Sequence, residues 1–259
     1  MFSLLRSEWY QVKKMNSVKI TSAILLVVSV LYSVKILEPE QMEYLQANDR
    51  IYELYVGGGL CESMKDGAAC LLIAGLFAGF LISAGFENRT IQTAVSCGKS
   101  RTKVYVAKMC SYLSVVTILS VIYWLGSNVG AFIRYGLGTA ETVGNLSRTK
   151  YILGMLVAGT IAYISVFSIC GVIAFFSRRV GVTMGICFVG ILLGGNMLAV
   201  LLPEKVIKWI KLTPLGLYNQ VLKLNVSMED IWKTGLAGFL WTVLICGIGL
   251  WKFKRTGLK

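Results

Sequence analysis

Apolar residues gather along the chain into six long runs that are separated by shorter polar segments. The runs cover residues 20–37, 68–86, 104–126, 151–176, 180–202 and 234–251. Because a helix rises about 1.5 Å per residue, crossing about 30 Å of hydrocarbon takes about 20 such residues. The pattern therefore predicts an all-α integral membrane protein with six transmembrane helices in one domain, residues 1–259.

The residues before the first run follow a different pattern, in which apolar residues recur at helical spacing and basic residues fall mostly elsewhere. The apolar residues are Phe2, Leu5, Trp9 and Val12, and the basic ones are Arg6, Lys13 and Lys14. This pattern is typical of an amphipathic helix that lies in the membrane interface. We therefore expect an interfacial helix at residues 1–19. The alternative is a merely basic flank to the first span.

Composition supports a membrane protein. Hydrophobic residues make up 56% of the chain and charged residues 15%, and the mean hydropathy is +0.68. A soluble chain of this length would need far more charged surface, whereas lipid solvates an apolar exterior. The formal net charge of +13 could indicate nucleic-acid binding. In so apolar a chain it is more typical of basic residues retained at the cytoplasmic face, so we expect no nucleic-acid partner.

The basic residues are unevenly divided between the two sides that six spans define. An even number of spans places both termini on one side. If segment 87–108, Arg178 and Arg179 share that side, it holds fifteen Lys and Arg against Glu8 and Glu87. The other side holds eleven basic and eleven acidic residues. Because Lys and Arg are enriched in cytoplasmic loops, we expect both termini to be cytoplasmic.

Residue types that usually carry catalysis or bind metals are missing or badly placed. The sequence has no histidine, and its seven cysteines form no C-x-x-C pair. No predicted span has a carboxylate near its middle, where ion-coupled transporters generally bind the coupling ion. We therefore expect no catalytic residue, no metal and no cofactor in this chain. Asn196 is polar at depth, and it is either a contact between helices or part of a substrate path.

Four pairs of glycines lie four residues apart in or beside the apolar runs. They are Gly75/Gly79, Gly126/Gly130, Gly181/Gly185 and Gly190/Gly194. This spacing lets helix backbones approach closely. We expect the pairs to pack inside the chain, and the alternative is a face for a second copy.

The segment between the second and third runs contains Gly98, Lys99 and Ser100. These three residues match the last three positions of the phosphate-binding loop motif. The full motif G-x-x-x-x-G-K-[ST] needs a glycine at position 93, where this chain has Thr93. It also needs a preceding strand and a soluble α/β core, and a loop between two spans has no room for them. We therefore expect that the chain itself does not bind ATP.

Another interpretation uses every residue of this loop. Glu87 or Asn88 would start a short helix, Gly98 would end it in the left-handed conformation, and Ser100 would cap the next helix. The apolar side of the short helix would consist of Ile91, Ala94 and Val95. Residues 87–103 would then form a rigid basic knuckle fixed to two transmembrane helices and able to transmit a push. The alternative is a charged loop that only sets topology.

The stretch SAGFENRTIQTAVSCGKSRTKVYVAKM, residues 83–109, resembles the ABC-2 type permease subunits of ATP-binding-cassette exporters. An interfacial helix, six spans and a WKFKRTGLK tail also fit that family, so the resemblance covers essentially the whole chain. Its sharpest part is E-N-R-T-I from Glu87, followed by S-x-G-x-S-R-x-K from Ser96. Arg89 stands where the family often has glycine.

The resemblance implies a function and a set of partners. In that family the loop forms a coupling helix that docks on a separate ATPase subunit, which binds ATP and magnesium. The residues that would carry this role here are Glu87, Asn88, Arg89, Thr90, Ile91, Val95, Gly98, Lys99, Ser100 and Arg101. Two permease subunits, identical or homologous, would pair among the lipids of a bacterial plasma membrane.

Size and loop style are similar to the permeases of lantibiotic or bacitracin-type peptide immunity. The implied cargo is a hydrophobic or amphipathic peptide that is moved out of the cell or the membrane. Two other functions remain open from the residues alone. A secondary transporter would need no ATPase, and a membrane-anchored sensor or assembly protein would carry no cargo. A gene for a phosphate-loop ATPase beside this one would separate the exporter from both.

Overall fold

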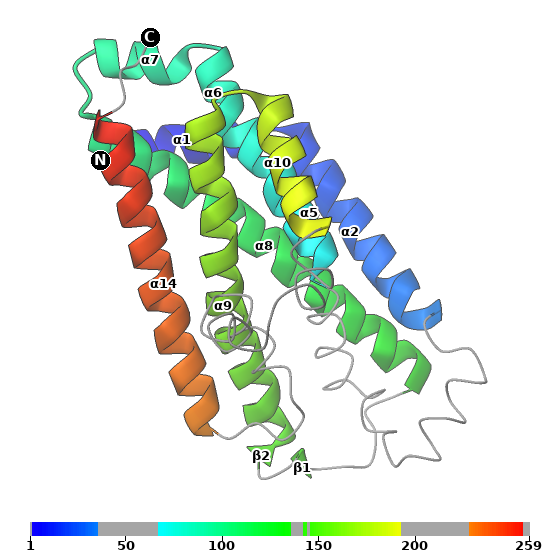
Figure 1. Cartoon of the computed structure of the whole chain (residues 1–259). Coiled ribbons are helices and arrows are strands. Elements are labelled where there is room, and N and C mark those ends of the chain that lie inside the picture. The colour runs from blue at the N-terminus through cyan, green and yellow to red at the C-terminus, as the bar shows by residue number, and fades with distance from the viewer. Residues whose placement is uncertain (1, 36–66, 136–141, 144–145, 193–227, 256–259) are drawn as a thin grey trace.

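The computed structural model describes residues 2–35, 67–135, 142–143, 146–192 and 228–255, which form a bundle of long helices (Figure 1). The predicted all-α class is confirmed. Within the described residues, the strands are a two-residue antiparallel pair, β1 (Thr142–Val143) and β2 (Leu146–Ser147). The helices are α1 (Phe2–Lys14), α2 (Asn16–Lys35), α5 (Ala68–Ala78), the π-helix η2 (Gly79–Ser83), α6 (Ala84–Glu87), α7 (Thr90–Ser96), α8 (Arg101–Tyr135), α9 (Arg148–Ser177), α10 (Val180–Leu192) and α14 (Met228–Arg255).

Four described segments are long and apolar enough to cross a membrane. They are Ala68–Glu87, Arg101–Ile133, Ile152–Ser177 and Ile231–Arg255. They match the predicted spans 68–86, 104–126, 151–176 and 234–251. Several of these helices extend past the predicted ends because helical hydrogen bonding continues through flanking polar residues, which an apolar run does not include.

The other two predicted spans are described in part. α1 and α2 bend by 61° at a break after Lys14, and together they pass the same test of length and hydropathy. The bend lies at Met15, so residues 16–19 belong to α2 and not to the predicted interfacial helix 1–19. α10 covers the first thirteen residues of span 180–202. The remainder, with Asn196, lies outside the described residues, so the count of six spans stays a prediction.

One end of the bundle carries most of the basic residues of the described chain. α1, α7 and the C-terminal end of α14 lie together at this end, and β1 and β2 lie at the opposite end (Figure 1). The turn between α9 and α10 belongs to the first end as well, as a hydrogen bond from Val180 to Glu87 shows. The chain segments expected to share one side of the membrane are therefore close together in space.

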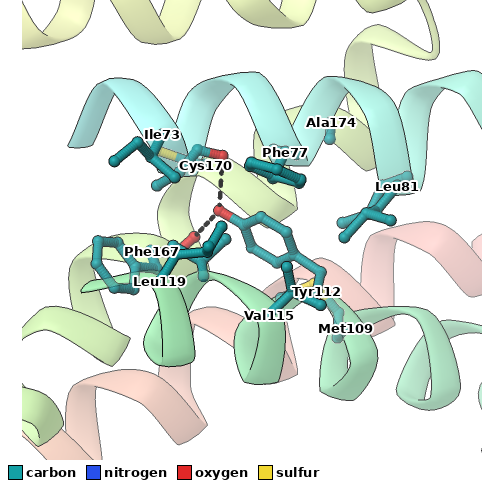
Figure 2. Close-up of a cluster of buried hydrophobic side chains, with 14 of the residues drawn as sticks. Ile73, Phe77, Leu81, Met109, Tyr112, Val115, Leu119, Phe167, Cys170 and Ala174 are labelled. Atoms are coloured by element: carbon teal, nitrogen blue, oxygen red, sulfur yellow. Dashed lines mark hydrogen bonds between the residues drawn. The ribbon is translucent and has the colours of Figure 1, made fainter. Parts of the chain in front are cut away.

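α8 is the central helix of the bundle, in contact with α1, α2, α5, α9 and α14. Its Tyr112 is fully buried, and the hydroxyl lies 3.1 Å from the carbonyl oxygens of both Ala74 on α5 and Phe167 on α9 (Figure 2). Apolar side chains from these helices surround the ring. A single phenol therefore joins three helices through a polar contact in an otherwise apolar core.

The glycine pairs separate into two groups. A Cβ added at Gly75 would lie 2.7 Å from the Cβ of Cys187, and one at Gly79 would lie 3.0 Å from a Met184 methyl carbon, so α5 and η2 pack tightly on α10. A Cβ at Gly126 would collide with Ser29, which brings α2 against α8. By contrast, an added Cβ on three glycines of α10 would meet nothing within 4 Å: Gly181, Gly185 and Gly190. The prediction of internal packing holds for the first group and is wrong for the three described α10 glycines, which lie on an open face; Gly194 lies outside the described residues.

α14 presents one apolar side away from the bundle. Its exposed large side chains are Trp232, Leu236, Phe239, Leu240, Val243, Leu244, Ile248 and Trp251. The twenty residues from Trp232 to Trp251 span about 28 Å of helix, close to the thickness of the hydrocarbon core. Tryptophan is enriched at both membrane interfaces, so this spacing is typical of a lipid-facing helix.

We predict that Tyr112→Phe destabilises the bundle by about 1 kcal/mol, because the hydroxyl donor between α5 and α9 is lost while the ring remains. Thermal unfolding of the detergent-purified protein measures the change. Tyr10→Phe is the matched control, since Tyr10 is exposed on α1. Equal unfolding midpoints for the two variants would show that the buried hydroxyl contributes nothing.

Candidate ATPase-coupling site

The knuckle, residues 87–103, begins with a tight turn between α6 and α7. The amide of Asn88 donates to the carbonyl of Ala84 and the amide of Arg89 to that of Phe86, which ends α6. Arg89 then takes the left-handed conformation, with φ of 57°, and stands as the N-cap of α7. The prediction that Glu87 or Asn88 starts the short helix is therefore wrong, because both residues complete the preceding helix and the reversal occurs at Arg89.

The other end of α7 follows the sequence prediction. Gly98 has φ of 82°, a conformation in which a side chain would be strained. The Gly98 amide donates to the carbonyl of Val95, and the Lys99 amide donates to that of Ala94. This pair of bonds is a Schellman motif, which satisfies the last carbonyls of the helix. α8 begins directly afterwards, and the Ser100 carbonyl accepts its first helical hydrogen bond, from Val104.

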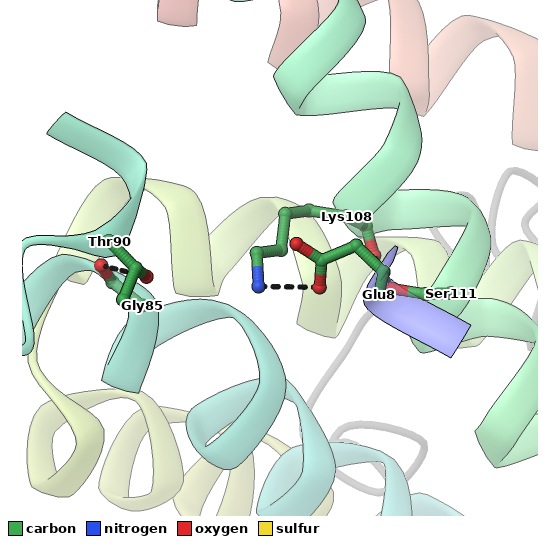
Figure 3. A network of polar contacts seen from close by, with 5 residues as sticks. All are labelled: Glu8, Gly85, Thr90, Lys108 and Ser111. Carbon is green, nitrogen blue, oxygen red and sulfur yellow. Dashed lines mark hydrogen bonds and ion pairs between the residues drawn. The ribbon is translucent and has the colours of Figure 1, made fainter. Parts of the chain in front are cut away.

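α7 is anchored to the bundle by its first turn. Ile91 is only 1% exposed, and the Thr90 hydroxyl donates to the Gly85 carbonyl at 3.0 Å (Figure 3). The side-chain amide of Gln92 donates to the Phe86 carbonyl at 3.3 Å. A Cβ at Gly85 would lie 3.2 Å from Ile91, so a glycine lets α7 fold back closely over α6. The apolar side predicted for the short helix therefore faces inward.

The opposite side of the knuckle faces solvent and is polar or basic. The exposed residues are Glu87, Asn88, Arg89, Thr90, Thr93, Ser96, Cys97, Gly98, Lys99, Ser100 and Lys103. Val95 and Arg101 are half-buried. The structure thus brings the predicted residues together on one short surface, except for Ile91, which belongs to the core beneath it.

Glu87 has an internal partner that the sequence did not reveal. Its Oε1 accepts a hydrogen bond of 2.9 Å from the Val180 amide, which is the first residue of α10. A carboxylate at a helix N-terminus satisfies a free amide and is attracted by the positive end of the helix dipole. The α9–α10 turn lies close to α6. Its Arg178 has a left-handed backbone, with φ of 55°, and the Arg178 guanidinium lies 5.6 Å from the centroid of the Phe86 ring.

Four aromatic side chains join the helix ends below the knuckle. Phe86 of α6 packs edge-on against Phe175 of α9, with ring centroids 5.9 Å apart. Phe253 of α14 lies 5.2 Å from Phe175, and Tyr105 of α8 lies 4.5 Å from it. Arg101 adds a 3.0 Å hydrogen bond to the Lys254 carbonyl. The knuckle therefore rests on a cluster that connects the ends of four helices.

A chain of buried hydroxyls links η2 to the same α9–α10 turn. The Ser83 hydroxyl lies 2.6 Å from that of Thr183, which also contacts the hydroxyl of Ser177. Ser83 and Thr183 are completely buried. Ser83 also donates to the Ala174 carbonyl of α9, so these contacts join η2, α9 and α10. An isolated Ser or Thr in an apolar run gives no sign of this pairing.

An apolar groove lies between α5 and α10, below the hydroxyl chain. Its volume is about 440 Å³, and the residues that line it are Leu72, Gly75, Leu76, Met184, Gly185, Cys187 and Phe188. Leu72, Leu76 and Phe188 are exposed at its edges. Asn196, the predicted residue of a substrate path, lies outside the described residues.

Comparison with known proteins gives one finding. The family model described as ABC-2 family transporter protein matches residues 4–194, more than half of the chain. The chain belongs to the ABC-2 transporter family. The match contains most of α1, the knuckle and all of α10, and no curated protein matches the chain. This ABC-2 protein is a multi-pass membrane permease component, as the apolar helices also indicate.

The left-handed conformation of Arg89 generates a prediction about the ABC-2 knuckle. Arg89→Gly and Arg89→Ala both remove the guanidinium, but only the glycine variant also removes the Cβ that disfavours this backbone. We expect the glycine variant to be more stable than the alanine variant by about 1 kcal/mol. Thermal unfolding and amide exchange in α7 measure this difference. Equal values would mean that position 89 carries no backbone strain.

Proposed function

We propose that this chain is the membrane-spanning subunit of an ABC-type exporter, powered by a separate ATPase subunit that docks on the knuckle. Two permease subunits would pair in the bilayer above two ATPase subunits, which would hold ATP and magnesium. The basic end of the bundle would face the cytoplasm, in agreement with the enrichment of Lys and Arg there. Closure of the ATPases would push the two knuckles and open a route to the outside.

The observation that carries this proposal is the hydrogen bond between Glu87 and the start of α10. A push on the exposed side of α7 reaches α6 through the buried Ile91 and the Thr90 bond to Gly85. Glu87 then connects α6 to the N-terminus of α10. The knuckle is therefore joined to α10, the helix that also forms one wall of the apolar groove.

The groove between α5 and α10 supports an apolar or amphipathic cargo, such as a peptide antibiotic. Its lining is apolar, and ligand sites for such molecules have mostly hydrophobic walls. The open glycines on α10 lie on the same helix, where a second permease subunit could approach closely. Pairing on this face would enclose the groove between two subunits and make it part of the route.

Membership of the ABC-2 family favours the exporter over the two alternatives from the sequence. A secondary transporter would need a site for a coupling ion, and a sensor would need no lever between its cytoplasmic loop and a transmembrane helix. The Glu87 connection is such a lever. An ATPase that co-purifies with the chain would distinguish the exporter from both.

We predict that Glu87→Lys uncouples transport from ATP hydrolysis. Lysine would break this exposed hydrogen bond and place a positive charge at the positive end of the α10 dipole, so transport should fall about fivefold. Transport and ATPase rates are measured in vesicles that contain both subunits, with membrane insertion checked by fractionation. Glu229→Lys is the matched control, since Glu229 is exposed and lies on α14 at the opposite end of the bundle. Equal coupling in both variants would contradict the role of Glu87.

We also predict that the exposed side of α7 is needed for ATPase docking. Replacement of Thr90–Ser96 by a Gly/Ser linker of equal length should abolish co-purification of the ATPase, because a flexible segment cannot present a fixed surface. Affinity purification from native membranes followed by mass spectrometry gives the partner list. Lys233→Ala is the control, because Lys233 is exposed and lies on α14, outside the knuckle. Retention of the ATPase by the linker variant would place the docking surface elsewhere.

A further inference from the structure

α1 packs against α8. It also has the amphipathic pattern expected from the sequence. Val12 is 6% exposed, and Trp9 and Met15 pack against the core. Ser7 and the basic residues of the last turn are exposed. The bundle therefore covers part of the apolar side of the predicted interfacial helix.

An ion pair lies in the middle of this contact. Lys108 Nζ of α8 donates to Glu8 Oε2 of α1 at 2.6 Å (Figure 3). The two side chains are only 10% and 14% exposed. Lys108 lies two turns inside α8, on a segment otherwise long and apolar enough to span the membrane. Glu8 is on the inward side of α1, close to Trp9 and Val12.

Simple attachment of α1 would not need these charges. Apolar side chains of similar size would hold two helices together without the cost of removing two ions from water. A buried pair, in contrast, defines one register, because any shift of α1 along α8 leaves a charge without its partner. The Glu8–Lys108 pair therefore specifies where α1 sits and resists its sliding.

Lys108 belongs to the helix that grows directly out of the knuckle. The Schellman turn at Gly98 leads without a break into Arg101, and Arg101 binds the end of α14. α8 is thus connected to the knuckle at its start and to α1 two turns later. A displacement of the knuckle that tilts or moves the first turns of α8 carries Lys108 with it.

We infer that Glu8 and Lys108 are positioning residues that make α1 follow the knuckle. This inference rests on the proposed function, since it assumes that the knuckle moves when ATP binds to the partner. α1 and the knuckle then act as one unit at the cytoplasmic end of the bundle. The ion pair passes the movement to a second surface, the exposed basic side of α1.

Spin-label distances test this directly in the assembled transporter. One label is placed on native Cys97 at the end of α7, which is exposed, and a second on α1 through Ser7→Cys. A separate sample pairs Cys97 with Leu153→Cys, an exposed position on α9 toward the other end of the bundle. The remaining cysteines are replaced by alanine. Distances are recorded without nucleotide and with a non-hydrolysable ATP analogue.

With the pair intact, we expect the analogue to change the distance from Cys97 to position 153 and to leave the distance from Cys97 to position 7 unchanged. In the Glu8→Gln variant, the analogue should change the distance from Cys97 to position 7, and the distribution of this distance should broaden. Transport per ATP hydrolysed should fall about tenfold in this variant. The exchanged pair Glu8→Lys with Lys108→Glu should restore both readouts, which a variant with a folding defect would not do.

The outcomes separate the inference from the proposed function. If position 7 moves relative to Cys97 in the intact protein, or if Glu8→Gln behaves as the intact protein does, the inference is overturned while the exporter stands. If the distance from Cys97 to position 153 does not respond to the analogue, the moving knuckle itself is contradicted. Glu229→Gln is the matched control because it breaks an exposed pair with Lys233, 3.3 Å long, and should change neither readout.

Discussion

A few polar side chains buried in this apolar bundle find their hydrogen-bond partners on other helices, and the described packing depends on those contacts. Lipid tails are as apolar as leucine, so the hydrophobic effect does little to hold one transmembrane helix against another. Close packing at small residues and a few polar bonds do this instead. The Tyr112 hydroxyl between two backbone carbonyls, and the Ser83–Thr183 pair, each join helices that are distant in the sequence.

Contacts of the same kind hold the knuckle against the bundle. A loop between two spans could satisfy its backbone with water, yet α7 is joined to α6 by side-chain bonds and a buried isoleucine. Its two ends are defined by left-handed residues, Arg89 and Gly98. Short reversals of this kind hold α7 close to the ends of the helices around it.

Charges at this end of the bundle have two different roles. Most basic residues are exposed, and their enrichment at this end is the reason to expect that it faces the cytoplasm. The two acidic residues there are both bonded inside the protein: Glu87 to the start of α10, and Glu8 to Lys108. Each connects an element at the membrane surface to a helix within the bundle. Their scarcity in a basic region makes each pairing specific.

The sequence by itself determined the features that depend on neighbouring residues. Apolar run length located the helices, the Arg178–Arg179 interruption located the turn between α9 and α10, and Gly98 located the end of α7. It was less accurate at Arg89, because a left-handed arginine has no local signal, and at Met15, where the amphipathic pattern continues smoothly into the first span.

Only the tertiary structure decided which side chains meet. Glu87 and Val180 are 93 positions apart, and Glu8 and Lys108 are 100 apart. A periodic pattern shows that a residue lies on one side of a helix, but it does not show which other helix lies opposite. The physical reason is that helix adjacency in a membrane is chosen by many weak contacts from distant segments, and no local stretch of the chain contains them.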